Sequence, residues 1–200
     1  IGPNTSEELA SGWARFPSEL AFAIGKKTLQ DLQEGGKDIT ITDERGTEIR
    51  ARVELSQWSG AGIRGPLDKP GSYAVIPSST VGTNQIKEAN GRIFHDFLEI
   101  FGPSQEICEW VVKDNWVVDI KGGPQAEAFK DRVFKIKNAN RLSQISWGLN
   151  PKIKAKKYLQ PPWDKNKMGI LTRSAGIIHT GLGSTLFHQG GESKIASAIH

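Results

Sequence analysis

The first 36 residues carry the hydrophobic pattern of helices. Apolar residues recur at three-to-five-residue spacing between residues 6 and 34, which is typical of one helix face. Pro17 interrupts this pattern and Gly35 and Gly36 end it, because proline breaks helices and glycine favours their C-terminal ends. We therefore predict two helices in residues 1–36, forming a lead-in or the remnant of a preceding domain.

The pattern then changes to the alternation of apolar and polar residues that is typical of strands. Residues 39–53 alternate on both sides of a turn at 43–46, and residues 108–120 do so on both sides of Asp114 and Asn115, which predicts two β-hairpins. Residues 73–76 and 145–149 predict further short strands, and residues 93–101 form another apolar segment. The middle of the chain is therefore expected to be rich in β-structure.

One helix is expected among these strands. Residues 126–142 place Phe129, Val133 and Ile136 on one face, whereas residues 151–167 predict a long polar loop. The expected fold class is α+β, with N-terminal helices followed by an antiparallel or barrel-like β region with one inserted helix. Residues 37–200 would form this β-rich domain, and we expect the chain to be the C-terminal part of a larger protein.

Composition and charge exclude several classes of function. The formal net charge of +4 is a mild excess with acids interspersed, so nucleic-acid binding is not implied, and the lysines of residues 152–157 predict a solvated loop. No apolar run reaches the length of a membrane span, and the N-terminus lacks a signal-peptide pattern. Cys108, the single cysteine, lies in an apolar segment that predicts a half-buried strand rather than a reactive thiol, and a single cysteine indicates a reducing, cytoplasmic compartment.

Histidine placement gives the strongest indication of a site. Three of the four histidines, His179, His188 and His200, fall in the last 22 residues among glycines that permit close backbone approach to a ligand. Neutral imidazole binds divalent transition metals, but a buried histidine with a structural hydrogen bond is an equal alternative for His179. For His95 we expect a surface position and pairing with Asp96.

Polar residues among the same glycines also have two interpretations. Ser184 and Thr185 could bind polar groups of a substrate or form local turn hydrogen bonds, and Glu192 could serve as a ligand, a base or an exposed turn residue. The sequence contains no phosphate-binding loop, zinc-finger spacing, nucleophile elbow or dinucleotide fingerprint. A metal site in the last 22 residues is therefore the more specific hypothesis.

Short motifs occur in a fixed order between residues 38 and 200. They lie at residues 39–49, 70–77, 116–123, 148–151 (GLNP), 178–183 (IHTGLG) and 190–200. Together they resemble the thermophilic metallo-aminopeptidase family, which contains aminopeptidases T and S and the related 2,5-dihydroxypyridine 5,6-dioxygenases. The order and spacing of the motifs, rather than any single one, carry this resemblance.

The resemblance implies a metal site whose ligands can be compared with this chain. For the aminopeptidases it implies two metals held by ligands that include two glutamates, two histidines and a closing aspartate. His179 and His200 fall on the histidine positions, but the glutamate positions correspond to Thr80 and Gln144. Loss of two anionic ligands disfavours a second divalent cation. His179, His200 and an aspartate expected two residues beyond His200 would form the two-histidine, one-carboxylate set of non-haem Fe(II) oxygenases.

By this resemblance the chain is expected to be a mononuclear Fe(II) dioxygenase that cleaves a hydroxylated aromatic ring such as 2,5-dihydroxypyridine. His188 would act in proton transfer, Ser184 and Thr185 would orient the small aromatic substrate, and the protein would be a homodimer. The alternative is a metallo-aminopeptidase using Zn or Co. A non-catalytic domain that retains no transition metal is the third possibility.

Overall fold

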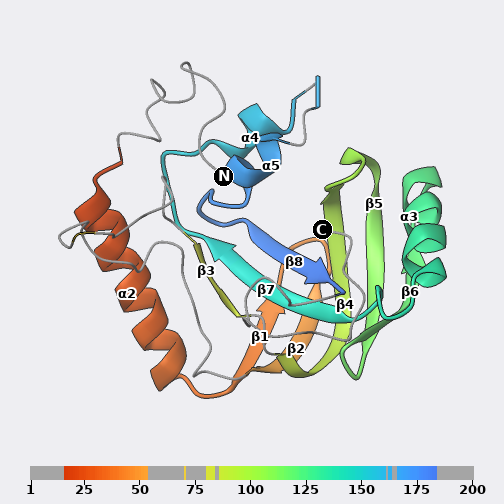
Figure 1. Ribbon diagram of the computed structural model, residues 1–200, viewed down its shortest axis with the longest axis horizontal. Coiled ribbons are helices and arrows are strands. Elements are labelled where there is room, and N and C mark those ends of the chain that lie inside the picture. Colours follow the sequence, from red (N-terminus) through yellow and green to blue (C-terminus); the bar gives the residue numbers. More distant parts are fainter. Residues whose placement is uncertain are drawn as a thin grey trace. The chain divides into compact units, whose positions relative to one another are not determined.

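The computed structural model describes residues 16–53, 70, 80–83, 86–160, 162–163 and 166–183, which form an α+β fold (Figure 1). The strands build a five-stranded sheet of order β1-β2-β4-β5-β6 and a three-stranded sheet of order β3-β7-β8. The expected fold class is confirmed, and neither sheet closes into a barrel within these residues. The first predicted helix and the strand predicted at residues 73–76 lie outside the described ranges.

The chain divides into two compact units. One contains Ile1–Gly35, Trp58–Gly82 and Ser146–His179, and the other contains Gly36–Gln57, Thr83–Ile145 and Thr180–His200. The five-stranded sheet belongs to the second unit. The domain boundary expected after residue 36 stays a prediction. No helix in the described part is both long and apolar enough to cross a membrane.

Helix α2 spans Ser18–Glu34 and begins directly after Pro17. Proline is compatible with a helix start because its missing N–H would have no helical partner there. Gly36 follows the helix with a φ of +100°, which glycine adopts without strain. The helix predicted between Pro17 and Gly35 is therefore confirmed at both of its ends.

Strands β1 (Asp38–Thr42) and β2 (Glu48–Val53) form the first predicted hairpin. The Asp43 carboxylate accepts hydrogen bonds from the backbone N–H groups of Arg45 and Thr47 and from the Thr47 hydroxyl. The Thr47 hydroxyl oxygen also accepts the Phe94 N–H at 3.0 Å, which ties the turn to the next strand of the sheet. This network explains why the turn forms at residues 43–47.

Strands β4 (Ile86–Leu98), β5 (Gly102–Lys113) and β6 (Trp116–Lys121) complete the sheet. The predicted turn between β5 and β6 is confirmed, with Asp114 at φ 50° and Asn115 at φ 71°. Positive φ at both central residues matches the right-handed twist of the strands. Gly91 allows β2 to approach β4, because a Cβ atom there would lie 2.1 Å from the Glu48 carbonyl oxygen.

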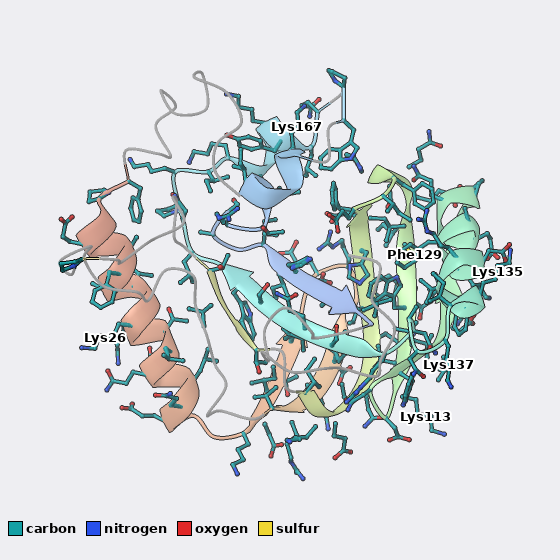
Figure 2. The ribbon with its side chains drawn as sticks, in the orientation of Figure 1. Lys26, Lys113, Phe129, Lys135, Lys137 and Lys167 are labelled. Carbon is teal, nitrogen blue, oxygen red and sulfur yellow. The ribbon has the colours of Figure 1, made fainter. Side chains whose placement is uncertain are left out.

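Helix α3 spans Pro124–Lys135 and packs on β5 and β6. The Phe129 ring stacks on Trp110 at a centroid distance of 5.5 Å, and Figure 2 shows Phe129 on the sheet side of α3 and Lys135 on the far side. The helix ends seven residues before the predicted residue 142, because Ile136 is extended and Leu142–Gly148 forms strand β7. Pairing with neighbouring strands overrides the local helical pattern there.

The second sheet consists of β3 (Thr80–Thr83), β7 (Leu142–Gly148) and β8 (Ile178–Leu182), with β7 in the middle. The Gly148 N–H donates to the Ile177 carbonyl oxygen and the Gly183 N–H donates to that of Arg141, so β7 and β8 run antiparallel (Figure 1). Ile145 and Leu182 are fully buried. The short strand predicted at 145–149 is thus confirmed but begins earlier.

Two short helices occur where we predicted an uninterrupted loop at residues 151–167. Helix α4 spans Ala155–Tyr158 and α5 spans Asn166–Leu171, so the prediction of a single helix among the strands was also wrong. The buried side chains that hold this segment are Ile153, Tyr158, Ile170 and Leu171. They are too few and too widely spaced to give a helical period in the sequence. The lysines of residues 152–157 are exposed, as predicted.

Candidate functional site

His179 is the predicted metal ligand that the structure describes. It lies on β8, its ring is half-buried, and its Nδ1 atom is 3.4 Å from the hydroxyl oxygen of Ser146 on β7. The Nε2 atom is buried from solvent. When Nδ1 carries the proton and donates it to Ser146, Nε2 presents its lone pair, which is the form that binds a metal.

The three-stranded sheet also carries the two positions at which the resemblance implies glutamates. Thr80 begins β3 and Gln144 lies on β7, and both side chains are half-buried. Gln144 and Ser146 are two residues apart on β7, so their side chains lie on the same face of that strand. The strands TVGT, LSQISWG and IHTGL contain no aspartate or glutamate. The sheet therefore offers the His179 imidazole without an accompanying carboxylate.

The GLNP segment fixes the end of β7 against the turn that precedes β8. Gly148 permits this approach, since a Cβ atom there would lie 2.1 Å from the Ser174 carbonyl oxygen. The buried Asn150 donates its backbone N–H to the Arg173 carbonyl oxygen and accepts the N–H of Ala175, both in the same turn. The Ser174 hydroxyl donates to the Ile153 carbonyl oxygen at 2.9 Å. This motif is therefore a structural frame beside His179.

His95 lies elsewhere than predicted. Its ring is half-buried, tilts at 45° against Trp110 with a centroid distance of 4.0 Å, and places Nε2 3.4 Å from the Thr180 hydroxyl oxygen. Its neighbour Asp96 is exposed and forms an ion pair with Arg45. Adjacent strand residues point to opposite faces, so the surface position predicted for His95 was wrong. The alternating apolar residues on both sides of His95 were the missed signal.

Cys108 is not a nucleophile. It is fully buried in β5, and burial raises the pKa of its thiol to about 11, although a hydrogen bond with Trp110 acts in the opposite direction. A thiol with this pKa stays protonated and unreactive near neutral pH. The predicted half-buried strand is confirmed, and Cys108 lies on its buried face.

The remaining predicted site residues lie outside the described part of the chain. These are Ser184, Thr185, His188, His200 and the alternative candidate Glu192. In the ranges that are described, no three His, Cys, Asp or Glu side chains are grouped as a metal ion would require. A metal bound by His179 would therefore need other ligands from residues outside the described ranges.

Comparisons with known proteins place this geometry in context. The family model described as 2,5-dihydroxypyridine 5,6-dioxygenase (NicX) matches residues 18–195. The fold is similar to that of 2,5-dihydroxypyridine dioxygenase from Pseudomonas putida KT2440, with a TM-score of 0.66 and 19% identity over 87% of this chain and 50% of that one. It is also similar to wild-type AmpT from Thermus thermophilus, with a TM-score of 0.60 and 14% identity over 88% of this chain and 43% of that one.

The chain thus spans about half the length of the first of these structures and less of the second. None of the curated proteins matches it in sequence.

Proposed function

Because the chain belongs to the 2,5-dihydroxypyridine 5,6-dioxygenase family, we propose that it is a mononuclear non-haem iron dioxygenase. Its substrate would be a small hydroxylated aromatic ring such as 2,5-dihydroxypyridine. The observation that carries this proposal is the family match over residues 18–195, within which His179 lies on β8 beside Ser146. As a cytoplasmic homodimer, the protein would act on a soluble small molecule.

The proposed ligands are His179, His200 and a carboxylate beyond His200. Fe(II) held by two histidines and one carboxylate keeps coordination positions open to a ring hydroxyl and to dioxygen. Ser146 would hold the His179 ring in the tautomer whose Nε2 is unprotonated, by accepting the proton of Nδ1. This contact supports a ligand role because it orients the imidazole before any metal binds.

The other predicted residues have roles in handling the substrate. His188 would accept or return a proton of the ring hydroxyl, and Ser184 and Thr185 would orient the ring through hydrogen bonds. The glycines between residues 181 and 191 would let the backbone approach a flat ring closely. These roles follow from the sequence and are part of the proposal.

Metal content decides between the proposed function and its alternatives. Elemental analysis of the anaerobically purified protein should find about one iron per chain, lost in both His179→Ala and His200→Ala. The control His95→Phe should keep the iron, since phenylalanine preserves the ring packing on Trp110. Oxygen uptake with 2,5-dihydroxypyridine should follow the iron content. A protein without any metal would refute the proposal and favour a non-catalytic domain.

A metal-dependent aminopeptidase is the second candidate. The similarity of the fold to AmpT favours it, and the resemblance implies Zn or Co in such a site. Two zinc or cobalt ions per chain, together with cleavage of amino-acid amides without oxygen uptake, would support this alternative. The uncharged Thr80 and Gln144 count against it, because a pair of divalent cations needs carboxylate charge.

A further inference from the structure

Strand β8 carries His179 near its N-terminal end, where its own side chains anchor it only weakly. His179 is the second residue of β8, and Ile178 before it is 38% exposed. The large buried side chain of the strand, Leu182, lies at the other end, next to the hydrogen bond from the Gly183 N–H to the Arg141 carbonyl oxygen. The end that carries His179 therefore depends on contacts from outside the strand.

These contacts join the end of β7 to the turn before β8. The Gly148 N–H donates to the Ile177 carbonyl oxygen at 2.9 Å, two residues before the histidine. The Asn150 N–H donates to the Arg173 carbonyl oxygen at 2.9 Å, and the Asn150 carbonyl oxygen accepts the Ala175 N–H at 3.0 Å. Three backbone hydrogen bonds thus hold the chain that leads into β8.

Gly148 is the position in this contact that has no room for a side chain. A Cβ atom there would lie 2.1 Å from the Ser174 carbonyl oxygen and 2.6 Å from the Arg173 carbonyl carbon. Both are backbone atoms, so a methyl group would fit only if the turn moved away from β7. The buried Ser174 also donates its hydroxyl to the Ile153 carbonyl oxygen at 2.9 Å. A displaced turn would carry the start of β8 with it, because His179 follows Ser174 by only five residues.

We propose that Gly148 is a positioning residue for the metal ligand His179. By letting the turn approach β7, Gly148 fixes the start of β8 where His179 Nδ1 lies 3.4 Å from the Ser146 hydroxyl oxygen. A small displacement would break this contact, since a separation of about 3.6 Å is no longer a hydrogen bond. The inference rests on the proposed function in treating His179 as a ligand, and it adds a role for the glycine of the GLNP segment in the geometry of the metal site.

Gly148→Ala tests this role, with Gly91→Ala as the matched control. In both variants the new methyl group would lie 2.1 Å from a backbone carbonyl oxygen, that of Ser174 in one and that of Glu48 in the other. Both variants should therefore lose stability in urea denaturation. In anaerobic Fe(II) titrations against a chelator, the affinity should fall about tenfold or more in Gly148→Ala, as expected when an orienting contact is lost. It should stay close to the wild-type value in Gly91→Ala.

Hydrogen exchange of the metal-free protein gives a readout that is independent of iron. In Gly148→Ala the amides of β8 should exchange about tenfold faster or more relative to those of β5, because the start of β8 opens locally. Gly91→Ala should not change the exchange of β8 relative to β5 in this direction, since its methyl group overlaps the five-stranded sheet. A wild type that binds no metal would refute the proposed function but leave this comparison intact.

Three results would overturn the inference. These are an unchanged relative exchange of β8 in Gly148→Ala, an equal acceleration in both variants, and equal Fe(II) affinities of the wild type and Gly148→Ala. If Gly148→Ala does not fold, Ser174→Ala replaces it, because this variant removes only the hydroxyl that donates to the Ile153 carbonyl oxygen. The relative exchange of β8 should rise in Ser174→Ala as well, and an unchanged rate there would overturn the inference.

Discussion

Replacing Ser146 by alanine is expected to weaken metal binding while leaving the fold in place. The Ser146 hydroxyl oxygen is 3.4 Å from His179 Nδ1, a long hydrogen bond that still orients the ring. Loss of such an orienting contact typically reduces metal affinity about 10- to 100-fold. Because this contact is long, we expect the lower end, about tenfold. The cost in unfolding free energy should be about 1 kcal/mol or less.

Ser143→Ala is the matched control on the same strand. Ser143 and Ser146 are both buried on β7, but the Ser143 hydroxyl donates to the Gly181 carbonyl oxygen at 3.1 Å instead of contacting a histidine. Both variants should lose similar stability in urea denaturation. In anaerobic Fe(II) titrations against a competing chelator, the affinity should fall only in Ser146→Ala. Equal metal affinities of wild type and Ser146→Ala, or an equal loss in both variants, would refute a role of Ser146 in orienting His179.

Three further predictions concern the five-stranded sheet. Gly91→Ala should destabilise the protein by about 2 kcal/mol or more in urea denaturation, since φ at this residue is +138° and the new methyl group would overlap the backbone of β2. Cys108 should resist iodoacetamide at pH 8 and react only after unfolding, because burial raises its pKa to about 11; rapid labelling of the native protein would contradict this. Partial burial acts to raise the pKa of Asp43, but the hydrogen bonds from Thr47 and Arg45 outweigh it and lower the pKa below 3.8. Its contribution to stability should therefore be present above pH 3.8 and disappear as the pH falls through the lowered value, and Asp43→Asn should flatten this part of the stability profile.

The elements that the sequence predicts well are those whose signals are local. Both hairpins of the five-stranded sheet follow from turn residues, namely the Asp43 carboxylate in one turn and the positive φ of Asp114 and Asn115 in the other. Helices α4 and α5 were missed because they are held by a few buried residues from separate positions. The end of α3 was placed too late because pairing of β7 with distant strands decides it.

In the candidate site, too, the sequence predicts the residues with a local signal and misses those that only strand pairing brings together. The sequence indicates His179 because histidines cluster among glycines, but it gives no sign of Ser146, which lies 33 residues away and meets His179 only through the pairing of β7 with β8. His95 was misplaced because the charge of its neighbour Asp96 received more weight than the strand alternation.

The charge around the His179 strand is an argument for the single metal that we propose. Two divalent cations at close range repel each other and lose much of their hydration, so the sites that hold them need several carboxylates. Strands β3, β7 and β8 contribute one imidazole and no acid, and the positions that the resemblance assigns to glutamate carry the uncharged side chains of Thr80 and Gln144. All carboxylate ligands of a second cation would have to come from other parts of the protein. One cation, held by nitrogen ligands and a single carboxylate, needs fewer carboxylate ligands. This difference favours the proposed mononuclear iron site.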